Sequence, residues 1–169
     1  MPDPSLELIA CIPRLRRYAR ALVGERNGAD DLVQDTVERG WSRIAEWRRD
    51  ADMRAWLFGI MHNLHVDHLR ARRLQTAPLE EADQHQAPAV NHGAALELRD
   101  MQAALDLLPA EQREILLLVA LEGMTYDQVA GTLGLPLGTV MSRLSRGREK
   151  LRALMEGRAA PVAPLQVVK

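Results

Sequence analysis

Apolar residues recur every three or four positions along most of this chain, and this spacing restricts its fold more than any other feature. Three stripes share the spacing: Leu15, Tyr18, Ala19, Leu22 and Val23; Val33, Val37, Gly40, Trp41 and Ile44; and Leu57, Ile60, Met61 and Leu64. No segment alternates apolar and polar residues between hairpin turns, and aromatic residues, which favour strands, make up only 4% of the chain. The sequence therefore predicts an all-α fold.

The second stripe leads to two local expectations. Asp30 and Asp31 precede it, and acidic residues suit the positive end of a helix dipole, so we expect a helix to begin there. Trp41 falls on the apolar side of that helix, so we expect it in the core. Trp56 is expected at the edge of the core.

The helical spacing fails from Gln75 to about Ala95. This stretch contains Pro78, Pro88 and Gly93, and its composition is typical of a linker. We therefore predict two small helical domains, residues 1–74 and 96–158, joined by a flexible linker over 75–95. A flexible tail is predicted over 159–169.

Composition excludes several classes of protein. The 22 Lys and Arg against 23 Asp and Glu give a net charge of −1, which argues against unspecific coating of nucleic acid. Cys11 is the only cysteine, so an internal disulfide framework and a multi-cysteine metal site are excluded. No apolar run approaches the roughly 20 residues of a membrane helix, and the N-terminal residues lack the order of a signal peptide. These features predict a cytoplasmic protein without membrane insertion.

The second predicted domain has the pattern of a helix-turn-helix. Pro109 can start a helix that ends at Gly123, and Thr125 can cap a short helix over 126–133. A turn rich in glycine and proline follows, and Thr139 can then cap a last helix. Two helices joined by such a turn are typical of domains that place the second helix in the major groove of DNA.

The last helix would have an apolar back and a polar, arginine-rich front. The front carries Met141, Ser142, Arg143, Ser145, Arg146 and Arg148, with Thr139 at its start. Arg and Ser can reach base edges and phosphates in the groove. The alternative is a helical hairpin with a solvated charged face, but acidic residues would then be expected among the bases, and residues 139–148 contain none.

The first predicted domain carries a second polar pattern. On a helix that starts near Arg54, Asn63, Asp67 and Arg70 are spaced i, i+4 and i+7, and they form a polar stripe beside Leu57, Met61 and Leu64. Trp47 and Trp56 bracket a short polar loop.

At this point the chain resembles the extracytoplasmic-function (ECF) group of bacterial sigma factors. The resemblance rests on four motifs in the right order and spacing over about residues 10–155: DLVQD at 31–35 followed by Trp41, WLxxIxxNxxxDxxR at 56–70, LPxxxR at 108–113, and GxxxGTVxSRxxRGR at 134–148.

The resemblance implies a role for each part. The helix around Asp31, Gln34, Asp35 and Arg39 would bind core RNA polymerase, whose β′ clamp and β flap are the implied contacts. The loop and helix of the first domain would capture an unpaired base of the minus-ten element through Trp47, Arg48, Arg49, Asp50, Met53, Trp56, Asn63, Arg70 and Arg73. The last helix would bind the minus-thirty-five element, and an anti-sigma factor is a further implied partner.

Two other functions remain open at the level of sequence. The chain could be an autonomous helix-turn-helix regulator that binds operator DNA without polymerase. His62, His65 and His68 could belong to a metal-responsive module, although their spacing spreads the three rings over roughly 120° of a straight helix. No enzyme motif is present, and we predict no catalytic residues, no metal site and no cofactor.

Overall fold

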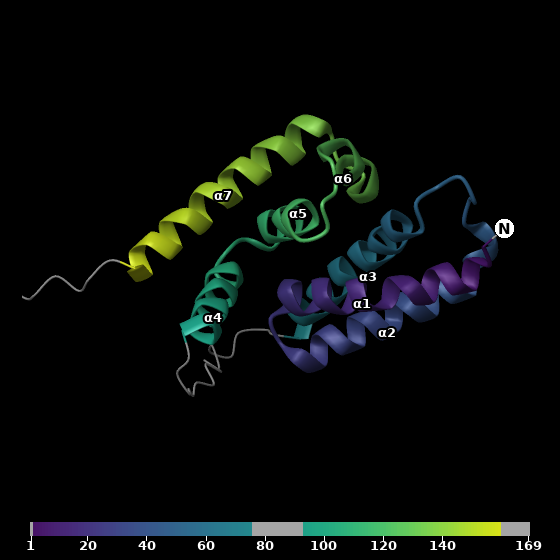
Figure 1. Ribbon diagram of the computed structural model, residues 1–169, viewed down its shortest axis with the longest axis horizontal. Coiled ribbons are helices and arrows are strands. Elements are labelled where there is room, and N and C mark those ends of the chain that lie inside the picture. Colours follow the sequence, from purple (N-terminus) through teal and green to yellow (C-terminus); the bar gives the residue numbers. More distant parts are fainter. Residues whose placement is uncertain (1, 76–92, 160–169) are drawn as a thin grey trace, which may run out of the picture.

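The computed structural model describes residues 2–75 and 93–159, and every regular element within these ranges is a helix (Figure 1). The prediction of an all-α fold is therefore confirmed. The elements are α1 (Pro4–Val23), α2 (Arg26–Ser42), a short 3₁₀ turn η1 (Ile44–Glu46), α3 (Met53–Gln75), α4 (Gly93–Asp106), α5 (Ala110–Ala120), α6 (Tyr126–Leu133) and α7 (Leu137–Ala159).

Helices α1, α2 and α3 form the first lobe, residues 2–75. Figure 1 shows α1 and α2 side by side, and α3 packs against both. The predicted stripes supply the interior, in which the Tyr18 and Phe58 rings meet edge to face with centroids 4.8 Å apart. The largest fully buried side chains here are Leu8, Leu15, Leu22, Leu32, Leu57, Phe58 and Met61.

Two expectations for α2 are wrong. The helix begins at Arg26, before Asp30 and Asp31, because the Glu25 carboxylate accepts hydrogen bonds from the first backbone N–H groups. Trp41 is 52% exposed, because the neighbouring Gly40 is the residue that faces the interior. A Cβ on Gly40 would lie 2.7 Å from Leu57 Cδ2 and 3.3 Å from Leu8 Cδ1, so this face of α2 has no room for a side chain.

Helices α4 to α7 form the second lobe, residues 93–159. Thr125 caps α6 as predicted, and its side chain and that of Gln128 form a reciprocal capping box. Gly134 ends α6 in the left-handed conformation, with φ of 66°. Helix α7 begins at Leu137 instead of at the predicted cap Thr139, because the Pro136 carbonyl already accepts from the N–H groups of Thr139 and Val140. Similarly, α5 ends at Ala120, three residues before the predicted Gly123.

The two lobes lie against each other. Buried side chains of both belong to one apolar cluster, and α1 contacts α4 and α5 while α3 contacts α6. In Figure 1, α5 lies between the first lobe and α7. The predicted linker, residues 75–95, is helical at both of its ends, because α3 runs to Gln75 and α4 starts at Gly93. The rest of that linker, residues 76–92, and the tail from 160 lie outside the described residues.

Candidate nucleic-acid and polymerase interfaces

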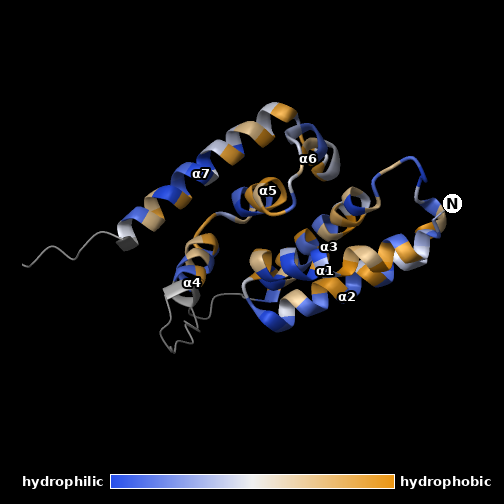
Figure 2. Cartoon of the chain, viewed as in Figure 1, coloured by the Kyte–Doolittle hydropathy of each residue, from blue (hydrophilic) through white to orange (hydrophobic). Residues whose placement is uncertain are grey.

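The front of α7 is open to solvent. Val140 and Leu144 are buried on its back, whereas Met141, Ser145, Arg146 and Arg148 are exposed. Their spacing keeps these four side chains on one side of the helix. Figure 2 shows hydrophilic residues in blue and hydrophobic residues in orange alternating along α7. This is the arrangement that a recognition helix needs in order to enter a major groove.

The other three predicted residues of α7 are partly covered. Ser142 Oγ donates to the Thr139 carbonyl at 3.2 Å, and Thr139 itself is half-buried. Arg143 forms an ion pair with Glu111 of α5 at 3.5 Å. The side chains of these three residues are therefore less available to contact a DNA major groove than those of the four exposed residues.

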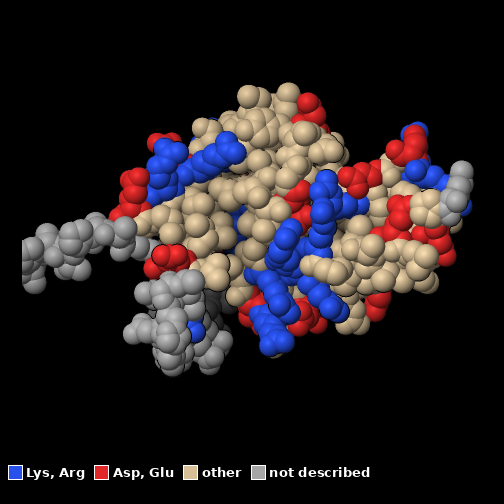
Figure 3. All heavy atoms as spheres, in the orientation of Figure 1, with Lys and Arg blue, Asp and Glu red and all other residues tan. Residues whose placement is uncertain are grey.

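Basic side chains gather in two places on the face drawn in Figure 3. One group lies over α7, and the other lies over α1 and the start of α2. The near-neutral net charge of the chain thus conceals separate local basic surfaces.

The loop at residues 47–53 has a buried floor and a charged rim. Trp47 is 8% exposed, Met53 is also buried, and the indole Nε1 has no hydrogen-bond partner. Arg48, Arg49 and Asp50 are exposed, and Arg48 pairs with Asp50 at 2.8 Å. The loop therefore combines an aromatic floor with side chains able to contact a phosphate or a base edge.

Three predicted residues of α3 align along one side of the helix. At 100° per residue, Trp56, Asn63 and Arg70 fall within about 40° of one another and extend over about 21 Å. Asn63 and Arg70 are exposed, and Trp56 is half-buried against the Gly40 backbone. Arg73 is also exposed, but it lies about 60° from Arg70 and about 100° from Trp56 around the helix.

The predicted polymerase-binding residues lie on α2. Asp31, Gln34 and Arg39 are exposed, and Asp35 pairs with His68 of α3 at 3.2 Å. Gln34 donates to Glu38 at 3.2 Å. Trp41, which was expected in the core, instead adds exposed apolar surface near the end of the same helix.

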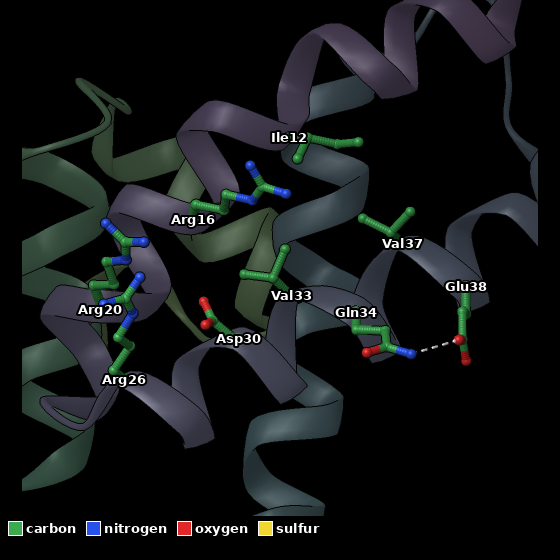
Figure 4. Close-up of a pocket in the computed structure, with 9 residues that line it drawn as sticks. All are labelled: Ile12, Arg16, Arg20, Arg26, Asp30, Val33, Gln34, Val37 and Glu38. Atoms are coloured by element: carbon green, nitrogen blue, oxygen red, sulfur yellow. Dashed lines mark hydrogen bonds between the residues drawn. The ribbon is translucent and has the colours of Figure 1, made fainter.

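A groove of about 550 Å³ runs between α1 and α2 beside these residues. Figure 4 shows Arg20 and Arg26 together at one end of the groove, with the Arg16 side chain reaching toward Ile12. Ile12, Val33 and Val37 make its middle apolar. A groove with this lining suits an amphipathic protein segment better than a small polar ligand.

The three histidines of α3 have three different environments. His62 Nδ1 lies 2.6 Å from Glu114 Oε1, and this hydrogen bond raises the pKa of His62 although burial opposes it. His65 is buried, and burial, with repulsion from Arg113 as the next cause, lowers its pKa to about 4. His68 pairs with Asp35. The part of the chain that the structure describes holds no group of three or more residues able to bind a metal ion.

Sequence reasoning assigned no structural role to the residues that join the lobes. Arg113 was identified only as part of the LPxxxR motif, and Glu122, which follows an apolar stretch, was not singled out. Glu122 is 4% exposed, and Arg113 donates to the backbone carbonyls of Leu105, Asp106, Leu108 and Leu22. A charged residue beside an apolar run does not by itself predict a contact between the lobes, because its partners are distant in the sequence.

Two protein-family models match the chain, one on each lobe. The model described as the Sigma2 domain of PhyR matches residues 8–62, and the model for region 4 of sigma-70 matches residues 98–151. None of the described helices is long and apolar enough to cross a membrane.

Similar proteins cover nearly the whole chain. The ECF RNA polymerase sigma factor EcfG of Rhodopseudomonas palustris is 39% identical over 88% of this chain and 83% of its own length. The ECF sigma factor SigE of Mycolicibacterium smegmatis is 37% identical over 82% of this chain, which spans 56% of that longer protein. The sigma factor RpoE of Bartonella quintana, solved in complex with the anti-sigma factor NepR, is 32% identical with a TM-score of 0.74, over 89% of this chain and 95% of RpoE.

Proposed function

The chain belongs to the family of ECF RNA polymerase sigma factors, and from this premise we propose which of its surfaces perform each step of initiation. Core polymerase binds along α2, an unpaired minus-ten base enters the loop at residues 47–53, and α7 binds the minus-thirty-five element. The observation that carries the proposal is the exposed polar front of α7 above a buried back.

Capture of the minus-ten base depends on binding energy and needs no bond chemistry. A base that leaves the stack costs a few kcal/mol, which stacking and hydrogen bonds to its edge must repay. The half-buried Trp56 supplies aromatic surface beside the loop, and the buried Trp47 supports the loop from below. Asn63 supplies an amide that can donate and accept. Arg48, Arg49 and Arg70 lie exposed along the same lobe and can contact the phosphates of the opened strand.

The minus-thirty-five element is bound as a duplex. Arg146 and Arg148 are exposed and can contact guanine edges or phosphates, while Ser145 can contact either. Met141, 50% exposed, offers an apolar contact such as a thymine methyl group requires.

Polymerase and an anti-sigma factor are the protein partners in this proposal. The exposed polar residues of α2, the Trp41 side chain and the groove between α1 and α2 form one continuous region for protein contacts. A partner helix that covered this region would exclude polymerase. We place the activity in the cytoplasm, where polymerase and promoter DNA are found.

Run-off transcription with purified core polymerase tests the proposal. The wild-type protein is expected to produce new transcripts from a library of its own genomic promoters. Asn63→Ala should abolish promoter opening, and Arg146→Ala should weaken minus-thirty-five binding by about 5- to 150-fold, the loss expected for one good contact to a base. Arg99→Ala is the matched control for Arg146→Ala, because its side chain is exposed on α4, which carries none of these surfaces. Tight duplex binding by the protein alone, with no transcripts, would favour an autonomous regulator.

A further inference from the structure

The front of α7 contains a hollow that α6 helps to form. Its volume is about 440 Å³, and its walls come from Tyr126 of α6 and from a stripe of side chains along α7. Met141, Ser145, Arg148 and Arg152 make up this stripe, because they fall within about 60° of one another around the helix. We call this feature the α6–α7 hollow. It lies on the surface that meets the minus-thirty-five element in our proposal.

The hollow is open because Ser145 is small. Met141 precedes Ser145 by about one helical turn and Arg148 follows it by about one turn, so a larger side chain stands on each side of the serine. A bulky residue at position 145 would fill the space between them. Ser145 is exposed, and its hydroxyl group can both donate a hydrogen bond to a ligand and accept one from it.

The lining of the hollow matches the major-groove edge of thymine. This edge carries a methyl group and the O4 acceptor. The Tyr126 ring and the Met141 side chain offer apolar walls to the methyl group, and the buried Leu144 adds to them. The Ser145 hydroxyl can donate to O4. Because a serine can bond to any of the bases, the apolar walls are what would select thymine.

The hollow is basic beyond these apolar walls. Arg148 Nη1 donates to the Tyr126 hydroxyl at 3.4 Å, so Tyr126 holds this guanidinium beside its own ring. Arg152 follows about one turn further along α7, and Glu149, the acid in the lining, does not balance both arginines. This part of the hollow therefore suits the phosphates that flank a bound base.

We propose that the α6–α7 hollow binds the edge of one thymine of the minus-thirty-five element, and that Tyr126 is a specificity-determining residue for that base. This inference rests on the proposed function, because the DNA-binding role of α7 is what brings a base to the hollow. Tyr126 acts from outside the recognition helix, since its ring completes the apolar wall from the side of α6. Met141 and Ser145 supply the other contacts to the base.

Replacement of single thymines by deoxyuridine tests the proposal, because deoxyuridine lacks only the methyl group. Duplex promoters identified by run-off transcription are titrated with holoenzyme after each thymine of the minus-thirty-five element, on either strand, is replaced in turn. At one position we expect the affinity of the wild type to fall about fourfold, the loss expected when one buried methyl group is removed. An unchanged affinity at every thymine, or an element without thymine on either strand, would overturn the proposal.

Variants show whether the methyl group is bound in the hollow. Tyr126→Ala and Met141→Ala should bind the thymine and deoxyuridine duplexes equally, whereas Tyr126→Phe keeps the ring and should retain the fourfold ratio. Asp127→Ala is the matched control on α6, because its exposed side chain lies outside the hollow. A fourfold ratio that persists in Tyr126→Ala would overturn the proposal. Since the ratio compares two duplexes bound by the same protein, partial unfolding of a variant cannot imitate its loss.

The outcomes separate this inference from the proposed function. Transcription by the wild type without any effect of deoxyuridine would refute the thymine subsite alone. Duplex binding by the protein by itself, without transcripts, would refute the proposed function, and the same replacements in that duplex would still decide the subsite. Failure to bind any duplex, with or without polymerase, would refute both.

Discussion

Acid should destabilise this protein through His65. The side chain is 7% exposed, its Nε2 has no hydrogen-bond partner, and burial lowers its pKa to about 4. In the unfolded chain the pKa of histidine is about 6.5, so the unfolded state binds a proton more readily than the folded state. The stability that follows from neutral His65 is therefore complete above pH 6.5 and is lost as the pH falls toward 4. Between pH 7 and pH 5 the loss is about 2 kcal/mol.

The replacement His65→Leu isolates this contribution. Leucine has a similar volume, cannot be protonated, and removes the unpartnered nitrogen, so the variant should be at least as stable as the wild type at pH 7. Urea unfolding of both proteins at several pH values gives the difference in their free energies of unfolding. This difference should grow by about 2 kcal/mol in favour of the variant on going from pH 7 to pH 5.

Other groups also change protonation between pH 7 and pH 5, so the effect of His65 is obtained from the difference between the wild type and His65→Leu. His62, whose pKa is raised by Glu114, contributes with the opposite sign: its stabilisation is present at low pH and lost as the pH rises through the raised value. It is present in both proteins and largely cancels. His68→Leu serves as a control, because His68 is part-exposed and pairs with Asp35. An equal pH dependence in the wild type and in His65→Leu would refute this account of His65.

Three further outcomes are expected. Gly40→Ala should lower the free energy of unfolding by about 1–3 kcal/mol in urea titrations, because its Cβ would meet Leu57 and Leu8; an unchanged value would show that α2 shifts freely. Thr125→Ala should cost about 1 kcal/mol, since it removes the cap of α6, and thermal unfolding would detect it as a lower midpoint. Arg148→Ala should weaken the binding of holoenzyme to duplex promoter DNA. If Arg148 contacts a phosphate, the plot of log binding constant against log salt concentration should also become shallower by about one; an unchanged slope would show that Arg148 contacts no phosphate.

Local features of the fold were predictable because their causes lie within a few residues. Thr125 and Gln128 are three positions apart, and their capping box needs no other part of the chain. The apolar stripe at Leu57, Met61 and Leu64 is likewise buried as its spacing predicts. The start of α2 was predicted less accurately, because the Glu25 side chain caps the helix before the predicted Asp30.

Features that depend on tertiary contacts could not be predicted in the same way. Trp41 and Gly40 are adjacent, and helical spacing allows either to face the interior. The close approach of Leu57 and Leu8 decides in favour of glycine. The assignment of particular residues of α2, α3 and α7 to polymerase and DNA stays a prediction, because exposure shows that a side chain is available and does not identify its partner.

The position of α5 shows how the second lobe supports the front of α7. Helix α7 packs on α4, α5 and α6, all of its own lobe. It approaches α5 closely at Gly147, where a Cβ would lie 3.4 Å from Gln112 Cβ and 3.7 Å from Leu116 Cδ1. Close apolar packing of this kind resists deformation, because each side chain already fills the space left by its neighbours. The exposed front of α7 should therefore keep its shape through contacts within the second lobe, and variants of its exposed residues should report on DNA binding without changing the fold.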